Sequence, residues 1–468
     1  MSRNLWLNLS IALVLILIAA FAGRLHKWNW HRAAQQTSHT SRSNEATATD
    51  PGSEESDSSK TEILVRFRAG VSAQAIENIT SRFNDEVEDH IEAVDGLDVI
   101  EDEDNRSADE VAAQYRALAE VEYAETNSEI KLDHEGAGKH LHANDELFFK
   151  QWGLFNHGQD GGKSGADISA MQAWAVTKGS DQVVVAVLDS GVDYTHPDLA
   201  GNIWTRPEII KQYEDSDLTS EGPIDDMHGF NVVEDNGDPM DDNGHGTHCA
   251  GIIGAEGGNE VGIAGVNWTV KIMPLKFMDS DGAGTTKDAI EAINYVINRK
   301  RAGVNVRVIS ASWGSTTKSR ALEDVIRKAG DEGILIVAAA GNDHSDNDAK
   351  PHYPASYDLN NVISVAAVNR NDELTTFSNF GATSVDVAAP GEQIISTWLQ
   401  HGFEEKQGTS MATPFVAGVA ALVLSTNPGI SIDELRLRLL NSVDAVPSLN
   451  GKVATGGRIN AAKAVAGG

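Results

Sequence analysis

The chain has 468 residues, of which 41% are hydrophobic and 23% are charged. This length and composition allow two or three domains with substantial cores, and they exclude a chain that is disordered throughout. The formal net charge of -32 argues against nucleic acid as a partner, because phosphate binding needs a basic face. The single cysteine, Cys249, excludes an intrachain disulfide and a zinc site built from cysteines.

The N-terminus has the pattern of an export segment. An apolar run over residues 5–22 follows Arg3 and ends in a small-x-small sequence, which is typical of a signal-peptide cleavage site. The run is also nearly long enough to span a membrane, and basic residues follow it, so an uncleaved anchor is the alternative. We therefore predict a signal peptide or membrane anchor over residues 1–23, and a protein that is secreted or tethered outside the membrane. Residues 33–60 have almost no large apolar side chain, and we expect residues 24–60 to form a disordered linker.

Residues 61–132 have the pattern of a small α+β domain. Strands are expected over residues 63–67 and around 94–100, and helices over residues 73–83 and 108–118. Together with further strand-like stretches, these elements give the order β-α-β-β-α-β, which predicts a ferredoxin-like arrangement.

From residue 144 to residue 468, continuous apolar strands alternate with helices. Because strands that are buried on both faces read as unbroken apolar runs, this alternation predicts an α/β fold with a doubly wound, mostly parallel sheet and helices on both faces. Strands are expected over residues 183–188, 272–277, 306–310, 334–339 and 362–367, and helices over residues 286–300, 321–330 and 410–425.

Three short motifs carry a candidate active site. Asp189 ends a predicted strand, His245 lies between two glycines at the start of a helix, and Ser410 lies in the sequence GTSMATP at the mouth of an apolar helix. Acyl transfer to a serine needs an activated hydroxyl, an imidazole that moves its proton, and a carboxylate that fixes the imidazole tautomer. Asn342 follows another predicted strand and could donate a hydrogen bond to a developing oxyanion.

Each of these residues alone has a simpler interpretation. An aspartate after a strand is usually a turn or cap residue, and a serine before a helix is usually an N-cap. A metal cluster of His245, His248 and Cys249 is another interpretation, but no fourth ligand is indicated and the HExxH pattern is missing. The coincidence of the three motifs favours the active site, and Cys249 is expected to be a small buried thiol beside it.

The motifs, their order and their spacing resemble those of the subtilisin-like serine proteases, from about Asp145 to the C-terminus. A seven-residue match such as GTSMATP has a chance frequency on the order of 1 in a billion per window. The segment 61–132 resembles the propeptide of the same family. The resemblance implies a serine endopeptidase that works through an acyl-enzyme intermediate and is made as a self-processing precursor. It gives Asp189 the role of orienting the imidazole, His245 that of general base and acid, Ser410 that of nucleophile, and Asn342 that of oxyanion donor.

The same resemblance implies a binding cleft for an extended polypeptide substrate. Two backbone segments would pair with the substrate, and a third would form a wall of the specificity pocket. They are Gly282, Ala283 and Gly284; Ser312, Trp313 and Gly314; and Ala339, Ala340 and Gly341. His352 and Asp343 would make this pocket unusually polar, so a processing protease that prefers a basic residue before the scissile bond is an alternative. A catalytically silent binding or chaperone module is another, but it would have lost a triad residue, and none is lost.

The propeptide itself is an expected partner. By resemblance it assists folding and then inhibits the enzyme by laying its C-terminal tail, at Tyr123–Asn127 and beyond, through the substrate cleft. Cleavage is expected between Leu132 and Asp145, and the glycine-rich residues 135–139 are a candidate position. The mature enzyme is expected to be a monomer.

Calcium is the expected cofactor, as one or two structural ions. Asn231, Glu234, Asn236 and Asp238 offer oxygen ligands at short intervals in a turn-rich loop, which suits a hard cation, although a solvated acidic loop is the alternative. The family resemblance favours the metal. It also implies a second site, formed by Asp145, Asp198 and Asn259 with backbone carbonyls of residues 257–263.

Overall fold

The computed structural model describes residues 61–91, 93–104, 106–132, 140–142, 147–214 and 223–467. The predicted export segment 1–23 and linker 24–60 lie outside the described residues. So do Asp145 and residues 133–139, which belong to the range in which cleavage is expected.

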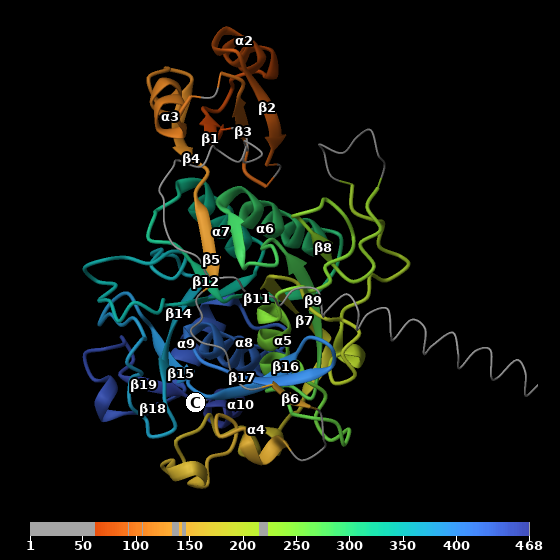
Figure 1. Ribbon diagram of the computed structural model, residues 1–468, viewed down its shortest axis with the longest axis vertical. Helices are drawn as coiled ribbons and strands as arrows, with labels where there is room; N and C mark the ends of the chain where they lie inside the picture. Colours follow the sequence, from red (N-terminus) through yellow and green to blue (C-terminus); the bar gives the residue numbers. More distant parts are fainter. Residues whose placement is uncertain are drawn as a thin grey trace, which may run out of the picture. The chain divides into compact units, whose positions relative to one another are not determined.

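Residues 61–126 form a four-stranded antiparallel sheet with the order β2-β3-β1-β4, and helices α2 and α3 pack on one face (Figure 1). This arrangement confirms the predicted β-α-β-β-α-β order. Strand β3 begins three residues later than expected, because the chain turns at Val94 and Gly96: Leu97 N–H donates to Val94 O at 3.1 Å and Gly96 has a φ of 75°. The elements are β1 (Thr61–Phe67), α2 (Ala73–Phe83), β2 (Asp85–His90), β3 (Leu97–Asp102), α3 (Ala108–Arg116) and β4 (Val121–Thr126).

A nine-stranded sheet forms the centre of the larger part of the chain. Its order is β18-β19-β15-β14-β13-β11-β7-β9-β8, and all neighbours are parallel except β18 and β19. This confirms the predicted doubly wound parallel sheet. The strands are β7 (Gly179–Asp189), β8 (Phe230–Asn231), β9 (Thr269–Lys276), β11 (Val306–Ala311), β13 (Leu335–Ala339), β14 (Val362–Val368), β15 (Val387–Pro390), β18 (Val443–Ala445) and β19 (Gly457–Ile459).

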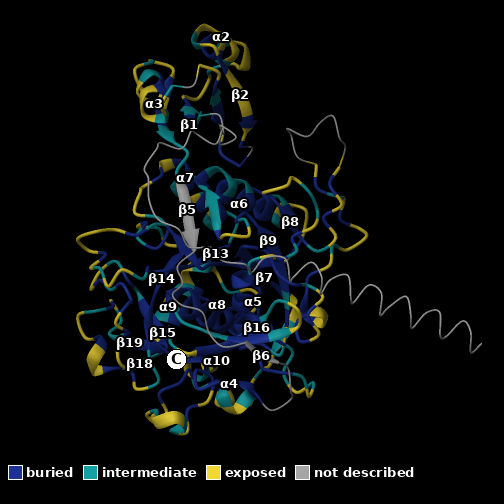
Figure 2. Ribbon diagram, viewed as in Figure 1, coloured by how far each residue is buried: buried dark blue, intermediate teal, exposed yellow. Residues whose placement is uncertain are grey.

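Both faces of this sheet are buried, because successive side chains of a strand point to opposite faces. In β7, Val183, Val185 and Val187 pack with one set of helices, while Val184, Ala186 and Leu188 pack with the other. Figure 2 shows the resulting buried interior. The first set is α4 (Ala170–Trp174), α5 (His245–Gly254), α8 (Thr409–Thr426), α9 (Ile432–Asn441) and α10 (Ala461–Ala466), and the second is α6 (Thr286–Arg301) and α7 (Arg320–Asp331).

Helix α8 crosses the core and is apolar all round, as expected for a helix without a solvent face. Among the described helices it alone has the length and hydropathy that could span a membrane, but 89% of that window is buried inside the protein. We therefore interpret α8 as a core helix. Helices α9 and α10 pack against it.

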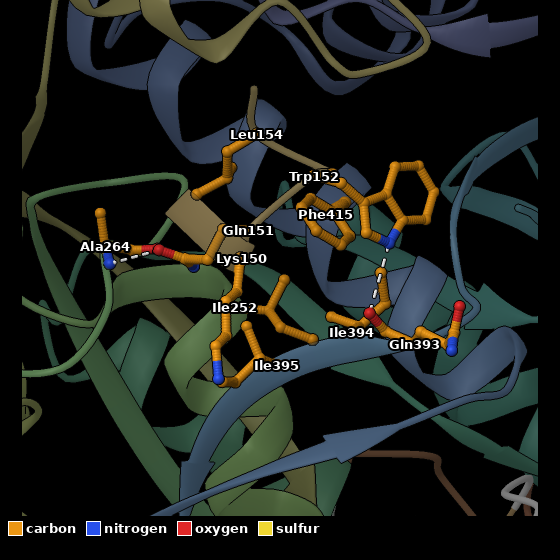
Figure 3. Close-up of a pocket in the computed structure, with 11 residues that line it drawn as sticks. Lys150, Gln151, Trp152, Leu154, Ile252, Ala264, Gln393, Ile394, Ile395 and Phe415 are labelled. Atoms are coloured by element: carbon orange, nitrogen blue, oxygen red, sulfur yellow. Dashed lines mark hydrogen bonds between the residues drawn. The ribbon is translucent and has the colours of Figure 1, made fainter. Parts of the chain in front are cut away.

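The segment that leads into the larger part is anchored against α8. Trp152 Nε1 donates to Gln393 O at 3.3 Å, and Gln151 Oε1 accepts from Ala264 N–H at 2.8 Å (Figure 3). Phe415 of α8 lines the same small apolar pocket. None of the predicted site residues lines it, so this pocket contributes to packing and is not the candidate active site.

Two short antiparallel sheets complete the fold. One has the order β16-β17-β6, with β6 at His140–His142, β16 at Ile394–Trp398 and β17 at Gly402–Lys406. The other has the order β10-β5-β12, with β5 at Glu129–Leu132, β10 at Ala283–Thr285 and β12 at Trp313–Gly314. In the second sheet the strand that follows the small domain lies between two strands of the larger part.

Candidate active site

Asp189 and His245 form the first contact of the candidate site. Asp189 ends β7 and His245 begins α5, and the Asp189 Oδ1 to His245 Nδ1 distance is 2.7 Å. Both residues are buried. The close approach requires a glycine after the histidine, since a Cβ on Gly246 would lie 2.0 Å from Gly191 O. A bond from Asp189 to Nδ1 fixes the tautomer of the imidazole and leaves Nε2 for proton transfer.

The charge of Asp189 also controls the protonation of His245. Burial by itself lowers the pKa of an imidazole, but the negative charge of Asp189 and its hydrogen bond outweigh this effect. The pKa of His245 is therefore raised above its usual value. A raised pKa makes the imidazole a stronger base toward a nearby hydroxyl.

Asp241 positions the start of α5, and it was not predicted from the sequence. This buried carboxylate accepts hydrogen bonds from Gly244 N–H at 2.9 Å, from Thr247 N–H at 2.9 Å and from Ser190 Oγ at 2.9 Å. Ser190 Oγ in turn accepts from Gly246 N–H at 3.1 Å. The only sequence signal was an acidic residue just before a helix, which is a common helix-start pattern.

Ser410 lies in the first turn of α8, where the helix dipole is positive. Its hydroxyl donates to Ser312 O at 3.0 Å. Its own carbonyl accepts from Ser312 Oγ at 2.9 Å and from the Cys249 thiol at 3.5 Å. This carbonyl is available because Pro414, four residues later, has no N–H to complete the helical bond.

Cys249 lies one turn along α5 from His245 and connects it with α8. The distance from Cys249 Sγ to His245 Nδ1 is 4.0 Å. The described residues contain one group of at least three metal-ligating side chains of the His, Cys, Asp and Glu types, and it consists of Asp189, His245 and Cys249. Burial raises the pKa of the Cys249 thiol, so this residue remains a protonated, buried thiol, as expected.

His248 argues against the zinc interpretation. Its Nε2 lies 3.1 Å from Ile394 O and 3.0 Å from Glu404 O. Burial lowers the pKa of His248 to about 3, so the ring is neutral. Its bonding to backbone carbonyls makes it a structural residue that ties α5 to the β16-β17 sheet.

Asn342 has the geometry of a hydrogen-bond donor with an open partner position. Its Oδ1 accepts from Thr409 N–H at 2.9 Å and from Thr409 Oγ1 at 3.1 Å, which fixes the orientation of the amide. Its Nδ2 is buried and has no hydrogen-bond partner among the described residues. Because Thr409 directly precedes Ser410, this amide group lies at the mouth of the helix that carries the serine.

The predicted peptide-binding segments lie on both sides of β5. Ala283 and Gly284 pair with β5 from one side, and Trp313 and Gly314 pair with it from the other. Trp313 Nε1 also donates to Leu188 O at 2.9 Å, which ties this edge to the strand that ends in Asp189. Gly282 precedes β10 and Ser312 precedes β12, so neither is a strand residue.

The predicted pocket wall lies between the Ser410 helix and β14. Ala340 N–H donates to Val365 O at 3.0 Å, Gly341 N–H donates to Thr409 Oγ1 at 3.2 Å, and Ala339 ends β13. His352 is buried beside Gly341, and a Cβ on Gly314 would lie 2.2 Å from its Nε2. Asp343, by contrast, is exposed.

The loop proposed for calcium brings its four oxygen-bearing side chains together. Glu234 N–H donates to Asn231 Oδ1 at 3.2 Å, Asn236 Nδ2 donates to Glu234 Oε2 at 3.1 Å, and Asp238 N–H donates to Asn236 Oδ1 at 2.9 Å. Tyr194 Oη donates to Asp238 Oδ1 at 2.8 Å. Carboxylate and amide oxygens in a tight loop fit a hard cation.

The second proposed calcium site is described in part. Asp198 Oδ1 accepts from Asn259 Nδ2 at 2.8 Å, and Asp198 Oδ2 accepts from Ile263 N–H at 2.9 Å. The structure therefore places Asp198 and Asn259 together at the loop that the sequence indicated. Asp145 lies outside the described residues.

The fold and the site together define an α/β protein with a doubly wound parallel sheet, a buried Asp-His pair, a helix-borne serine and an amide donor. Comparison with known proteins identifies the family. The profile of the subtilase family matches residues 180–458, and a fervidolysin N-terminal prodomain profile matches residues 44–127. The chain belongs to the subtilase family of serine proteases, with an N-terminal prodomain. The prodomain match begins inside the segment 24–60 that was predicted to be a linker.

Similar proteins include enzymes of bacteria and of a protozoan parasite. A thermophilic serine proteinase of Bacillus sp. (strain AK1) is 41% identical over 293 residues, which cover 63% of this chain and 64% of that protein. Thermitase of Thermoactinomyces vulgaris is 38% identical over 298 residues, covering 64% of this chain and 93% of thermitase. Subtilisin-like protease 1 of Plasmodium berghei (strain Anka) is 32% identical over 368 residues, which cover 74% of this chain and 59% of that protein. The chain thus spans less than two thirds of the first of these proteins.

Proposed function

We propose that this protein is a serine endopeptidase that hydrolyses peptide bonds through Asp189, His245 and Ser410. The observation that carries the proposal is the 2.7 Å contact between Asp189 and His245 Nδ1, together with Ser410 at the positive end of α8. His245 takes the proton of the Ser410 hydroxyl as the oxygen attacks a substrate carbonyl, and then passes it to the leaving amine. Water hydrolyses the acyl-enzyme by the same route in reverse order.

Asn342 stabilises the negative charge that develops on the carbonyl oxygen. Its buried Nδ2 has no partner in the described structure, so its donor capacity is not used before the reaction. The N-terminus of α8 adds partial positive charge at the same place. The polypeptide substrate binds as an extended strand between β10 and β12, by main-chain pairing that tolerates varied sequences.

The prodomain is an intramolecular inhibitor that occupies this cleft with its own strand, β5. Its tail also caps two helices of the protease domain: Glu125 accepts from Arg320 N–H at 2.7 Å at the start of α7, and Asn127 Oδ1 accepts from Lys287 N–H at 2.8 Å at the start of α6. Arg66 forms an ion pair with Asp324 of α7 at 2.7 Å. The bound tail keeps substrates out until it is cut and released.

The substitution Ser410→Ala tests this function. The variant is expected to fold but to lose peptide hydrolysis and self-cleavage, so that a precursor of full mass minus any signal peptide accumulates. Ser425→Ala, at the other end of the same helix, is the matched control and should be processed normally. Processing of the purified Ser410→Ala protein at the normal rate would show that the nucleophile is wrong.

We further propose that calcium stabilises the protease domain. Asn231, Glu234, Asn236 and Asp238 would hold one ion, and Asp198 and Asn259 would hold a second together with Asp145. The ion would neutralise the carboxylates and crosslink the loops that carry them. Thermal melting of the Ser410→Ala protein with and without a chelator tests this. The midpoint temperature of unfolding is expected to fall when the chelator is added, and an unchanged midpoint would contradict the calcium proposal.

The site of action is proposed to be outside the cell. The prodomain supports a precursor that is activated after export, and residues 1–23 would serve as a signal peptide or as a membrane anchor. N-terminal sequencing of the protein from the medium and from the membrane fraction distinguishes these two forms. Size-exclusion chromatography of the mature enzyme tests the expectation that it is a monomer.

A further inference from the structure

We propose that Asn379 is a positioning residue, whose side chain holds the turn that carries Asn342 and so sets where the oxyanion donor lies. The inference rests on the proposed function, because it assumes that the Asn342 amide stabilises negative charge on the substrate carbonyl. Asn379 belongs to the segment between β14 and β15, and no motif in the sequence indicated it.

The turn that carries Asn342 needs a support. It spans residues 340–345, directly after the end of β13 at Ala339. The bond from Thr409 N–H to Asn342 Oδ1 orients the amide, but it does not by itself place the backbone on either side of that amide. A group that acts on a transition state must be held within about 0.5 Å of its productive position. The residues that hold this turn therefore bear on the reaction.

The side chain of Asn379 contacts the turn on both sides of Asn342. On the N-terminal side, Asn379 Nδ2 donates to Ala340 O at 3.0 Å. On the C-terminal side, Asn379 Oδ1 accepts from Asp343 N–H and from Ser345 N–H, both at 2.9 Å. One amide group thus fixes the chain before and after the proposed oxyanion donor.

Gly341, the residue directly before Asn342, allows this close approach. Gly341 O accepts from the backbone N–H of Asn379 at 2.8 Å, and Gly341 has a φ of 104°. A Cβ at this position would lie 2.4 Å from Asn379 Nδ2. The turn therefore needs a glycine here, both for its backbone conformation and for the space that the Asn379 amide occupies.

Asn379 is itself held by the core of the protein. It is 1% exposed, and its carbonyl accepts from Ser378 Oγ at 2.8 Å, while Ser378 Oγ accepts from Ala367 N–H of β14 at 2.9 Å. Asn379 Nδ2 also donates to Asn347 Oδ1 at 3.1 Å, and Asn347 Nδ2 donates to Ala340 O at 2.8 Å. Because both polar atoms of the Asn379 side chain are bonded in a buried site, the amide cannot turn without leaving buried groups unpaired.

The consequence for the reaction is a donor that is in place before charge develops. A fixed donor needs no reorganisation in the transition state, which is the origin of its effect on the rate. Without the Asn379 side chain, the N–H groups of Asp343 and Ser345 lose their acceptor and the turn is expected to relax. A misplacement of about 1 Å can cost about 100-fold in rate. The loss should appear mainly in kcat, because the oxyanion is absent from the bound substrate.

A double-mutant cycle on kcat tests the inference. The four proteins are the wild type, Asn379→Ala, Asn342→Ala and the double variant, each matured by immobilised wild-type enzyme that is then removed. The substrate is the peptide anilide that the wild type hydrolyses fastest in a small panel. Asn379→Ala should lower kcat by about 10–100-fold, with a smaller change in KM. In the Asn342→Ala background the same substitution should lower kcat by less than about 2-fold, because the donor that it positions is already gone.

Asn361→Ala is the matched control. Asn361 is also a buried asparagine, and its Nδ2 donates to Ile326 O at 2.8 Å and to Ile334 O at 3.3 Å, near the start of β13 and not at its Asn342 end. This substitution also removes buried hydrogen bonds, so the melting temperature should fall, but kcat should stay within about 2-fold of the wild-type value. Ser410→Ala, matured in the same way, gives the activity of any carried-over enzyme.

Three results would contradict parts of this scheme in different ways. Unchanged kcat in Asn379→Ala, or a fall of equal size in both backgrounds, would overturn the positioning role and leave the proposed function intact. Full kcat in Asn342→Ala would instead overturn the oxyanion role that the proposed function gives to Asn342.

A second variant covers the case in which Asn379→Ala does not fold. Asn347→Ala then takes its place in the cycle, because Asn347 bonds both the Asn379 amide and Ala340 O. A fall in kcat that disappears in the Asn342→Ala background is expected. A fall that persists in that background, or no fall at all, would overturn the inference.

Discussion

The hydroxyl of Ser312 donates to the carbonyl oxygen of Ser410 at 2.9 Å, while the hydroxyl of Ser410 donates back to the carbonyl of Ser312 at 3.0 Å. This reciprocal pair joins the proposed substrate-binding edge to the helix that carries the proposed nucleophile. It forms because Pro414 leaves the Ser410 carbonyl without a helical donor.

Removal of the Ser312 hydroxyl is expected to destabilise the protein. In Ser312→Ala the buried Ser410 carbonyl loses its hydroxyl donor at 2.9 Å and keeps the weaker thiol donor of Cys249, so the free energy of unfolding should fall by about 1–2 kcal/mol. Urea unfolding in a Ser410→Ala background, which prevents self-digestion, measures this change. Ser315→Ala, on the same loop but away from α8, should change stability by less than about 0.5 kcal/mol. Equal effects of the two substitutions would contradict a stabilising role of the Ser312 hydroxyl bond to the Ser410 carbonyl.

Asn342 is expected to act mainly on kcat. Loss of one oxyanion donor costs about 10²–10³ in kcat in enzymes of this type, and KM should change little. Asn342→Ala removes both the Nδ2 donor and the Oδ1 acceptor of the Thr409 bonds, whereas Asn342→Asp keeps an acceptor for Thr409 N–H, loses the donor and adds a negative charge. Both variants should be impaired if the amide donor is the active group. Near-normal kcat in Asn342→Asp would show that the bond to Thr409 is what matters.

The pH dependence of activity should follow His245. The imidazolium cannot accept the serine proton, so kcat/KM should rise with pH as His245 loses its proton. Because burial lowers its pKa but Asp189 raises it by more, the midpoint should lie above the ordinary histidine value of about 6.5. Thermal melting at the same pH values separates this effect from acid unfolding. A midpoint well below 6.5 would contradict the raised pKa.

Propeptide binding should weaken as the pH rises. Glu291 of α6 is hydrogen-bonded to the buried Asp89 of the prodomain. Lys287 Nζ lies 3.9 Å from Glu291 Oε1, and it also forms an ion pair with Glu88 Oε1 at 2.6 Å. Burial, the bond to Asp89 and the charge of Asp89 raise the pKa of Glu291 well above its usual value. The complex therefore holds a proton that the separated parts release, and its stability is lost as the pH rises through this raised pKa.

Size-exclusion chromatography of the cut but unseparated protein, over a series of pH values, measures this release. Glu291→Gln should retain the propeptide to higher pH, because an amide donates to Asp89 without titrating. Glu332→Gln, at the C-terminal cap of α7 and paired with Arg301, should behave as wild type. Release that is independent of pH in the wild type would contradict the prediction.

Some features of the site could be predicted because they are local. Glycines beside His245 and the helix-start serine at Ser410 are short-range patterns, and the alternating apolar runs predicted a parallel sheet. Asp241 and Pro414 were not predicted as site residues, because their effect depends on contacts made across the fold. Asp241 accepts a hydrogen bond from Ser190, which lies on another element, and Pro414 frees the Ser410 carbonyl to accept from Ser312 and Cys249. The roles of the remaining calcium and pocket residues are still predictions.

The sequence by itself determined the family, the order of the functional motifs and the alternation of strands and helices, because each of these is encoded in residues that are close together along the chain. The tertiary structure alone decided which carboxylate reaches which imidazole nitrogen, which donors meet the Ser410 carbonyl, and where along the cleft β5 pairs. The first two depend on contacts between residues that are 56 or more positions apart in the sequence. The third depends on a strand register, which is set by the simultaneous pairing and burial of both partners.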